Sequence, residues 1–402
     1  MRKALSLSGF VLIIPLLILF LGSLRVFAQS FVWKEEGVIF SDPTIHNVAV
    51  IPLPDGRYRM YFASPSGETS SAEGGASFAT NVIKSAISSD GRSFQTEEGI
   101  RLEGSMPSII KLSDGKWRMY FAKQIATEQS EGSTSPNAIY SAVSSDGLNW
   151  SVEKGIRLSP GGEFDPDNVV HPSVIALPQG GYRMYYDGEV TKTEQEFTWR
   201  ILSATSPNGL TWAKDEGVRV DVGKSPLEAD LVFNSHAKYN ELTGTYELYF
   251  SVQRKIATEQ SEDNTSALGS GIYLATSTDG LLFSDPIVQL TPKSESGQFQ
   301  DPFVLEFPEG KRMYFAKQIA TEQGEDSTTK PDGIYSALLT KEVNDSEPKS
   351  ILETTKQKLA EIWGKVKEFK LPENLELYII PTILLLGGAV AVIYLWRSRI
   401  RR

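Results

Sequence analysis

The sequence has few of the side chains that carry thiol or imidazole chemistry. Its 402 residues include no cysteine and three histidines. Without thiols, disulfides, zinc–thiolate sites and cysteine nucleophiles are excluded, so the core has to provide stability by packing. The formal net charge is −10. This charge argues against nucleic acid as a partner, because binding to phosphates needs a basic face.

The chain begins with a long apolar segment. Residues 1–28 start with Arg2 and Lys3, continue with an apolar run and end in Val26-Phe27-Ala28, a candidate cleavage site. This pattern predicts a secretory signal peptide. Because the run is longer than most signal cores, an uncleaved signal anchor is the alternative.

A second apolar segment lies near the other end of the chain. Residues 377–396 contain no charge, and the tail 397–402 that follows is rich in arginine. A segment of about 20 apolar residues is long enough for a transmembrane helix. The positive-inside rule places the basic tail in the cytoplasm. The sequence therefore predicts a single-pass membrane protein with its ectodomain outside the cytoplasm.

Between these segments, a strand–turn–strand pattern occurs five times. In residues 171–188 an apolar run leads to a Pro-Gln-Gly-Gly turn, after which Tyr182, Met184 and Tyr186 alternate with polar residues. Successive copies are 59 to 65 residues apart when the following residues are taken as equivalent: Met60, Met119, Met184, Leu248 and Met313. Strand-rich repeats of this period indicate a β-propeller.

Each copy except the last continues with a third strand, a tight turn and a fourth strand. The turns contain Asp-Gly or Asn-Gly at residues 90–91, 146–147, 208–209 and 279–280, which is a strong hairpin signal. The fifth copy lacks this turn, and residues 31–40 match its missing fourth strand. We therefore expect an all-β, five-bladed β-propeller over residues 31–341, closed by the N-terminal strand.

The composition changes after the propeller. Residues 342–376 are rich in Glu, Lys and Ser and carry apolar residues at three- and four-residue steps: Leu352, Leu359, Ile362, Val366 and Phe369. This spacing predicts a linker with an amphipathic helix, which we interpret as a stalk between the propeller and the membrane. A self-associating coiled coil, through which an oligomer could form, and a helix lying on the membrane are the alternatives.

The three histidines occupy similar positions in their repeats. His46, His171 and His236 precede the marker residue of their copy by 12 to 14 positions, and Met106 and Asp301 hold this phase in the other two copies. The first strand of a blade lines the central channel, so we expect all three imidazoles to point there. Three converging imidazoles could bind a divalent metal ion. The alternative is that each histidine makes a local hydrogen bond within its blade.

Acidic residues lie close to these positions: Asp42, Asp165, Asp167, Glu228, Asp230 and Asp301. Several carboxylates at one mouth of a channel suit glycoside hydrolysis, which needs a general acid and a base or nucleophile. Nearby aromatic rings, such as Phe164, Phe233 and Phe299, could stack on sugars. Candidate substrate-binding residues are therefore Asp230, Asp301, His171, Phe164 and Phe299. The competing explanation is that Asp-Pro and Asp-Asn pairs cap turns.

A Thr-Glu-Gln sequence recurs in the loops that follow the second strand of a copy. It occupies residues 127–129, 258–260 and 321–323 within longer, nearly identical stretches, and residues 193–195 are a shorter echo. Duplication alone explains this similarity, or else the loops share a task at the rim. Their hydroxyl, amide and carboxylate oxygens would suit sugar hydroxyls or a calcium ion.

The chain resembles the five-bladed propeller glycoside hydrolases, the clan of the family 43 arabinanases and xylosidases and the family 32 fructosidases. The resemblance includes the blade count, the Asp-Gly-x-Tyr-x-Met-Tyr strands and the opening Asp42-Pro43-Thr44-Ile45. It implies that Asp42 is the general base, that Asp165 tunes pKa unless His171 replaces it, and that Glu228 is the acid.

These patterns lead to one hypothesis about function and one alternative. We expect a membrane-anchored, carbohydrate-active propeller outside the cytoplasm, acting as a glycoside hydrolase with a pair of carboxylates at the channel mouth. The alternative is a non-catalytic propeller that binds a glycan or a protein at the cell surface through its rim loops.

Overall fold

The computed structural model divides the chain into two units, Met1–Lys341 and Glu342–Arg402. It describes only parts of the first: residues 31–42, 44–66, 81–125, 135–193, 196–223, 227, 229–253, 271–292, 297–319 and 333–341. No helix within these ranges is long and apolar enough to cross a membrane. Several predictions fall on residues outside them: the signal segment 1–28, the linker 342–376, the transmembrane segment 377–396, the tail 397–402, Glu228 and most of the Thr-Glu-Gln loops.

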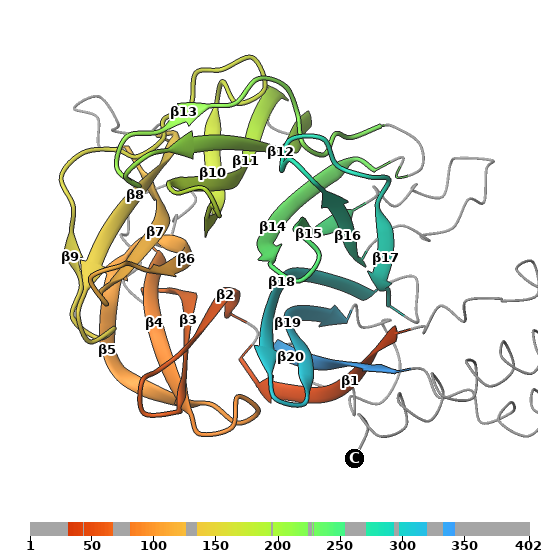
Figure 1. Cartoon of the computed structure of the whole chain (residues 1–402). Helices are drawn as coiled ribbons and strands as arrows, with labels where there is room; N and C mark the ends of the chain where they lie inside the picture. Colours follow the sequence, from red (N-terminus) through yellow and green to blue (C-terminus); the bar gives the residue numbers. More distant parts are fainter. Residues whose placement is uncertain are drawn as a thin grey trace, which may run out of the picture. The chain divides into compact units, whose positions relative to one another are not determined.

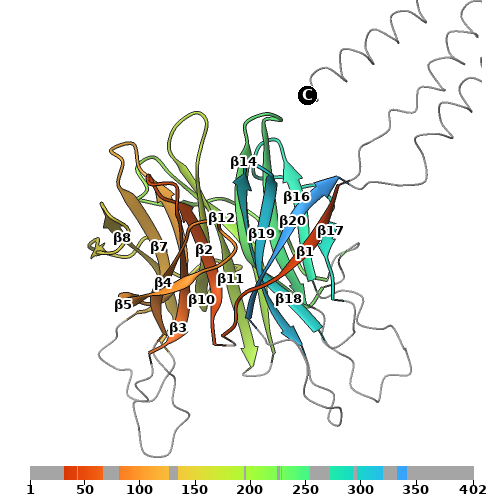
Figure 2. The same cartoon turned by 90° about the horizontal axis from the view of Figure 1, so that it is seen from below.

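The described residues form five antiparallel sheets of four strands each, arranged around a central channel (Figures 1 and 2). This arrangement confirms the predicted all-β, five-bladed propeller. From the innermost to the outermost strand, blade 1 is β2 (His46–Pro52), β3 (Tyr58–Pro65), β4 (Asn81–Ser88) and β5 (Gln95–Glu103); blade 2 is β6 (Ser105–Lys111), β7 (Trp117–Gln124), β8 (Asn137–Ser144) and β9 (Ser151–Val152).

The other three blades repeat the same order. Blade 3 is β10 (Asn168–Ala176), β11 (Tyr182–Thr193), β12 (Glu196–Ser206) and β13 (Ala213–Lys214); blade 4 is β14 (Leu231–Asn240), β15 (Thr245–Gln253), β16 (Gly271–Ser277) and β17 (Ile287–Leu290); blade 5 is β18 (Gly297–Phe307), β19 (Gly310–Ile319), β20 (Gly333–Lys341) and β1 (Phe31–Phe40).

Blade 5 combines the two ends of the propeller sequence. Strand β1 pairs antiparallel with β20, with Phe31 opposite Lys341 and Phe40 opposite Ile334. The N-terminal strand therefore supplies the outer strand that the fifth repeat lacks, as the sequence predicted. The hydrophobic core consists of buried side chains that pack between neighbouring sheets. The five marker residues at the centre of the second strands are fully buried: Met60, Met119, Met184, Leu248 and Met313.

Polar contacts, which we call latches, join four of the five blades to the tight turn of the next blade. A tyrosine hydroxyl on the second strand donates a hydrogen bond of 2.7 to 2.9 Å to the carbonyl of the turn glycine. The pairs are Tyr61 with Gly147, Tyr120 with Gly209, Tyr185 with Gly280 and Tyr314 with Gly91. The repeated tyrosines of the sequence motif thus join neighbouring blades as well as filling the core.

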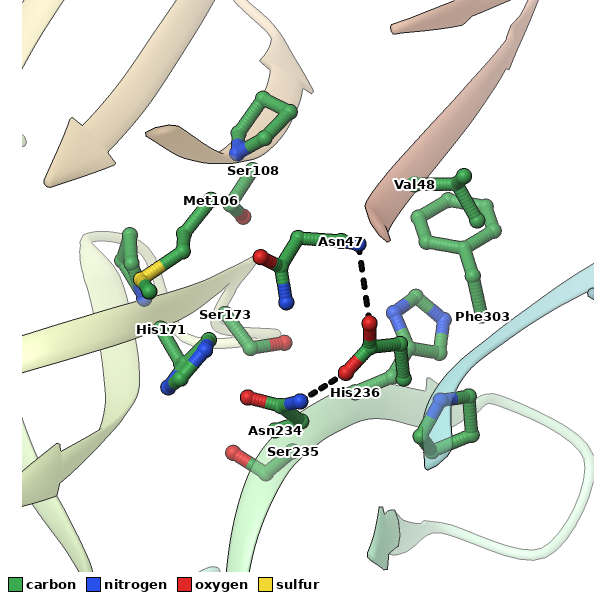
Figure 3. Close-up of a pocket in the computed structure, with 14 residues that line it drawn as sticks. Asn47, Val48, Met106, Ser108, His171, Ser173, Asn234, Ser235, His236 and Phe303 are labelled. Atoms are coloured by element: carbon green, nitrogen blue, oxygen red, sulfur yellow. Dashed lines mark hydrogen bonds between the residues drawn. The ribbon is translucent and has the colours of Figure 1, made fainter. Parts of the chain in front are cut away.

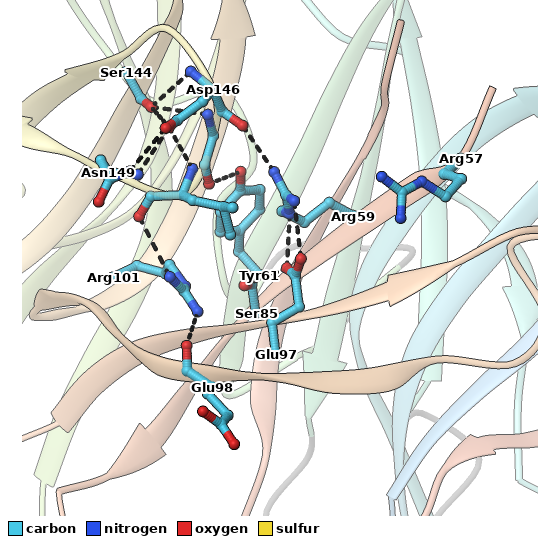
Figure 4. A network of polar contacts seen from close by, with 12 residues as sticks. Arg57, Arg59, Tyr61, Ser85, Glu97, Glu98, Arg101, Ser144, Asp146 and Asn149 are labelled. Atoms are coloured by element: carbon cyan, nitrogen blue, oxygen red, sulfur yellow. Dashed lines mark hydrogen bonds and ion pairs between the residues drawn. The ribbon is translucent and has the colours of Figure 1, made fainter. Parts of the chain in front are cut away.

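An arginine two residues before the tyrosine strengthens the latch (Figure 4). Arg59 contacts Glu97 of its own blade at 2.7 Å and donates to the carbonyl of Asp146 at 2.9 Å. Asp146 shapes the turn that receives these bonds, because its carboxylate accepts the backbone N–H groups of Leu148 and Asn149, both at 2.8 Å. These backbone bonds also lower the pKa of Asp146.

The seam between blades 4 and 5 differs. Blade 5 has no Asp-Gly turn, since β1 replaces the strand that would follow it, and blade 4 has Glu247 where other blades have the latch arginine. Glu247 instead forms an ion pair of 2.6 Å with Lys311 of blade 5. Trp33 of β1 donates a hydrogen bond of 2.9 Å to Gln289. Glu247 therefore replaces the arginine in blade 4 because the next blade offers Lys311 instead of an Asp-Gly turn.

Substitution of the latch arginine tests the importance of these seams. Arg59→Ala leaves Glu97 partly buried without its partner and removes the bond to Asp146, so we expect a loss of about 3 kcal/mol in unfolding free energy. Urea denaturation of the purified protein measures it. The control is Arg57→Ala, which removes an exposed pair with Asp55 and should leave the denaturation midpoint unchanged. Equal midpoints for the two variants would contradict a structural role for the latch.

Candidate functional site at the channel waist

Five non-glycine residues with positive φ mark the centre of the propeller. Each blade contributes one from its innermost strand, and together they form what we call the channel ring: Asn47, Met106, His171, Asn234 and Asp301, with φ between 49° and 58°. These are the positive-φ residues other than glycine among the described residues. Strained backbone of this kind often marks functional sites.

A β-bulge accounts for the ring in every blade. The pairing between the first and second strands shifts register at the same place, for example between Val170 and Ser173 in blade 3 and between Gln300 and Phe303 in blade 5. The equivalent shifts in the other blades lie at His46/Ala49, Ser105/Ser108 and Phe233/His236. Bulges re-aim side chains next to binding sites, and here they bring one residue per blade to the lining of the channel.

The channel ring separates two cavities, both of which it lines. The mouth cavity, on the N-terminal side of the ring along the inner strands, has a volume of about 270 Å³ and is also lined by His46, Trp199, Phe233, Gln300 and Lys317. The inner cavity, on the other side of the ring, has a volume of about 50 Å³ and is shown in Figure 3. Its lining includes Ser108, Ser173, Ser235, His236 and Phe303.

Asp301 is the acidic member of the channel ring. Its side chain is 5% exposed, its Oδ2 accepts the backbone N–H of Asn47 at 3.0 Å, and its Oδ1 accepts a hydrogen bond from the side-chain amide of Asn234 (Figure 3). Burial raises the pKa of Asp301, and the bond from Asn47 opposes this effect. Asp301, which the sequence predicted as a substrate-binding residue, lines both cavities.

His171 has a carboxylate directly behind it. Its Nδ1 lies 2.7 Å from Oδ2 of Asp187 on β11, and the two side chains are 7% and 0% exposed. The same Asp187 oxygen accepts the backbone N–H of Asn234 at 2.8 Å. Burial raises the pKa of Asp187, while the neighbouring imidazole lowers it. His171, which the sequence also predicted as a site residue, is thus held by a buried carboxylate.

Asp187 was missed in the sequence analysis, although a signal for it exists. In the second strand of each repeat, the residue three positions after the marker is small in the other blades: Ala63, Ala122, Ser251 and Ala316. Only the third repeat has a carboxylate there. Ser251 does a comparable job in blade 4, since its hydroxyl accepts the backbone N–H of Asp301 at 3.0 Å. A comparison of repeats at this position would have identified Asp187.

The predicted metal site of His46, His171 and His236 needs correction. His46 lies one residue before the ring position and His236 two residues after it, because a spacing of 12 to 14 positions along the sequence does not specify a single register in the paired strands. His236 Nε2 donates a 3.1 Å hydrogen bond to the carbonyl of Val304, and His46 Nδ1 lies 3.2 Å from the carbonyl of Thr44. Within the described ranges no group of three or more His, Cys, Asp or Glu side chains could hold a metal ion.

The two predicted catalytic carboxylates that the structure describes have local roles. Asp42 caps its own turn by accepting hydrogen bonds from the backbone N–H and hydroxyl of Thr44 at 2.9 and 2.7 Å. Asp165 is buried within blade 3, where it pairs with Lys214 at 2.6 Å and accepts the hydroxyl of Tyr186 at 2.9 Å. Neither lines a channel cavity. Their positions therefore do not support acid–base roles, and Glu228 lies outside the described residues.

The remaining predicted substrate-binding residues are not among those that line the two cavities. Asp230 precedes β14, and Phe164 packs on the blade 3 core with its ring 5.8 Å from the Arg200 guanidinium. Phe299 is a core residue whose ring lies 5.1 Å from that of Phe315. The aromatic rings that do line the mouth cavity are Trp199 and Phe233, with centroids 5.5 Å apart. Phe233 was among the rings expected to stack on sugars, whereas Trp199 was not, because it lies far along the chain from the residues of the channel ring.

The buried histidine of blade 4 makes stability depend on pH. Burial, together with the charge of Lys238, lowers the pKa of His236 from 6.5 to about 3. Between these values the unfolded chain binds a proton that the folded protein does not, so stability falls as pH decreases from 6.5 towards 3. His236→Gln keeps a hydrogen-bond donor and should show a shallower loss in denaturant titrations from pH 7 to 4. Parallel stability curves for the variant and the wild type would contradict this assignment.

No protein-family model and no curated protein sequence matches this chain. Solved structures do match in fold. One, described as a glycoside hydrolase, is 12% identical with a TM-score of 0.54, covering 83% of this chain and 95% of that one. A thermostable family-43 glycoside hydrolase is 12% identical with a TM-score of 0.52, covering 75% and 92%.

A third match concerns the GH130 family, described as mannoside phosphorylases that contain glycoside hydrolases targeting β-1,2 mannosidic linkages in Candida mannan. It is 14% identical, with a TM-score of 0.50, and covers 79% of this chain and 96% of that one. At these identities the likeness concerns the fold. The chain has the five-bladed propeller fold of glycoside hydrolases, which is the resemblance that the sequence predicted.

Proposed function

We propose that this protein is a carbohydrate-active propeller that binds a glycan at the mouth of its channel. The observation that carries the proposal is the mouth cavity, which combines two aromatic rings, Trp199 and Phe233, with the amides of Asn47, Asn234 and Gln300. Binding sites for small molecules typically join apolar walls to a few fixed polar groups. The volume of about 270 Å³ lies just below the range of drug-sized pockets, roughly 300 to 1,000 Å³, and suits one sugar unit.

Polar atoms without partners support a hydroxyl-rich ligand. Within the described residues, four buried atoms of the mouth lining make no hydrogen bond: Trp199 Nε1, Asn47 Oδ1, Asn234 Oδ1 and His171 Nδ1, the last of which lies 2.7 Å from Asp187. A buried polar group left unpaired costs about 1 to 3 kcal/mol, so these atoms favour a ligand that supplies both donors and acceptors. Sugar hydroxyls do both. The fold shared with glycoside hydrolases supports the same class of ligand.

The cellular location that we propose rests on two apolar segments of the sequence. Residues 1–28 and 377–396 support export and a single-pass anchor, with the propeller outside the cytoplasm. A membrane-anchored propeller in this position would meet extracellular glycans.

Hydrolysis of the bound glycan is the second candidate function. Asp301 favours it, because a buried carboxyl with a raised pKa at a sugar-sized cavity has the properties of a general acid. Asp42, the base implied by the clan resemblance, caps its own turn instead. The Asp-Pro pair that reaches the channel ring is Asp301-Pro302. Binding without turnover is the alternative that the same assays distinguish.

Substitution of Trp199, which lines the mouth cavity, tests glycan binding. Trp199→Ala removes one aromatic wall of the mouth cavity, so binding to immobilised oligosaccharides should weaken at least tenfold, or about 1.4 kcal/mol. The probes are arabinan, xylan, fructan and mannan oligosaccharides. The control Phe31→Ala alters an exposed ring on the outer strand β1 and should bind like the wild type. Absence of binding by the wild type to every probe would contradict the proposed function.

A further inference from the structure

The channel ring places two proton-carrying side chains on opposite sides of the channel. His171 belongs to blade 3 and Asp301 to blade 5, so within a ring of five blades they lie two positions apart with Asn234 of blade 4 between them. Both line the mouth cavity and the inner cavity. They also interact electrostatically, since the imidazole opposes the rise in the pKa of Asp301. A sugar at the ring would therefore meet an imidazole and a carboxyl from different directions.

The environment of His171 differs from that of the other buried histidine. His236 donates from Nε2 to the backbone carbonyl of Val304, which ties its ring to the neighbouring blade. His171 instead presents Nδ1 to the carboxylate of Asp187 at 2.7 Å. A carboxylate 2.7 Å from Nδ1 favours the tautomer with a proton on that nitrogen, which leaves the lone pair on Nε2. An imidazole held in this way is suited to accept a proton.

Asp187 makes two contacts through a single oxygen. It is completely buried on β11, and its Oδ2 also accepts the backbone N–H of Asn234, the ring residue of the next blade. The structural task of accepting that N–H needs only a hydroxyl, because Ser251 performs it for Asp301 one blade further on. Burying a carboxylate costs more free energy than burying a hydroxyl. The contact between Asp187 and His171 explains why a carboxylate is present at this position.

We infer that His171 and Asp301 form the acid–base pair of this channel, with Asp187 as the residue that positions His171. The inference rests on hydrolysis, the second candidate function above. Protonated Asp301 donates its proton to the glycosidic oxygen as the C–O bond breaks. Nε2 of His171 takes a proton from a water molecule whose oxygen bonds to the anomeric carbon. The products are a hemiacetal and an alcohol, and solvent then reprotonates Asp301 and deprotonates His171.

The inference assigns chemistry to residues that the clan resemblance does not. The resemblance points to Asp42 and Glu228, and to Asp165 as a modulator, whereas the channel ring offers one carboxyl and one imidazole. The titratable groups near this pair are His46 on β2 and Asp187 on β11, both of which interact electrostatically with it. Lys317 of the mouth cavity is paired with Glu35 at 2.9 Å. The pH profile of turnover therefore reports on a small set of named groups.

The experiment uses the full chain in detergent and the oligosaccharides that the wild type retains in the binding assay. Each is incubated in H₂¹⁸O, and mass spectrometry follows incorporation of ¹⁸O at the newly formed reducing end. The variants are His171→Ala, Asp187→Asn and Asp301→Asn, and the matched carboxyl-to-amide control is Glu306→Gln, whose side chain is 60% exposed. Thermal denaturation of each variant confirms that it folds.

We expect turnover by the wild type and the control, and at least about a hundredfold loss of kcat for each of the three variants. Asp187→Asn should lower kcat with KM changed less than about threefold, and it should shift the pH profile. Added imidazole should restore part of the activity of His171→Ala, which a purely structural role would not allow.

The outcomes separate the two levels of the proposal. A wild type that retains no glycan overturns the proposed function and the inference with it. A wild type that binds but incorporates no ¹⁸O leaves glycan binding standing and overturns the inference. Unchanged turnover in folded His171→Ala, or in folded Asp187→Asn at every pH, also overturns it.

Discussion

The left-handed backbone at five bulges is the constraint on which the centre of this protein depends. A residue other than glycine at positive φ is strained unless its surroundings hold it. At three of the five bulges the preceding blade does so: Asp187, Ser251 and Asp301 each accept the backbone N–H of a ring residue in the blade that follows. Each bulge brings one residue to the channel, and these five residues line both cavities. The shape of the cavities therefore depends on how the blades are joined.

The opposite face of the ring uses a different set of bonds for a similar purpose. Tyrosine and arginine side chains donate hydrogen bonds to carbonyls in the next blade's tight turn. In blade 2, for example, these carbonyls belong to Asp146 and Gly147. The latches therefore fix the spacing of blades from one side while the bulge bonds fix it from the other. Because the channel ring is assembled across seams, its geometry depends on both sets.

The repeats made the architecture predictable. A strand that alternates on each side of an Asp-Gly turn specifies its hairpin locally, and five such units with one missing strand leave few ways to close a ring. The functional centre was harder to predict. His171 and Asp301 were selected, whereas His46 and His236 were assigned the same phase although they lie one and two residues away from the ring positions Asn47 and Asn234. Trp199 was missed because it reaches the mouth cavity from a strand that does not carry a residue of the channel ring. Asp187 was missed although the repeats differ at its position.

The sequence by itself determined the blade count, the closure of blade 5 by residues 31–40 and the turn chemistry, because each depends on local periodicity and on the φ preferences of glycine. Only the tertiary structure decided which side chains meet at the channel. Bulges change the phase of a strand by one residue, and a one-residue shift moves every following side chain to the other face. The pairing of His171 with Asp187, and its placement across the channel from Asp301, therefore come from the assembled ring.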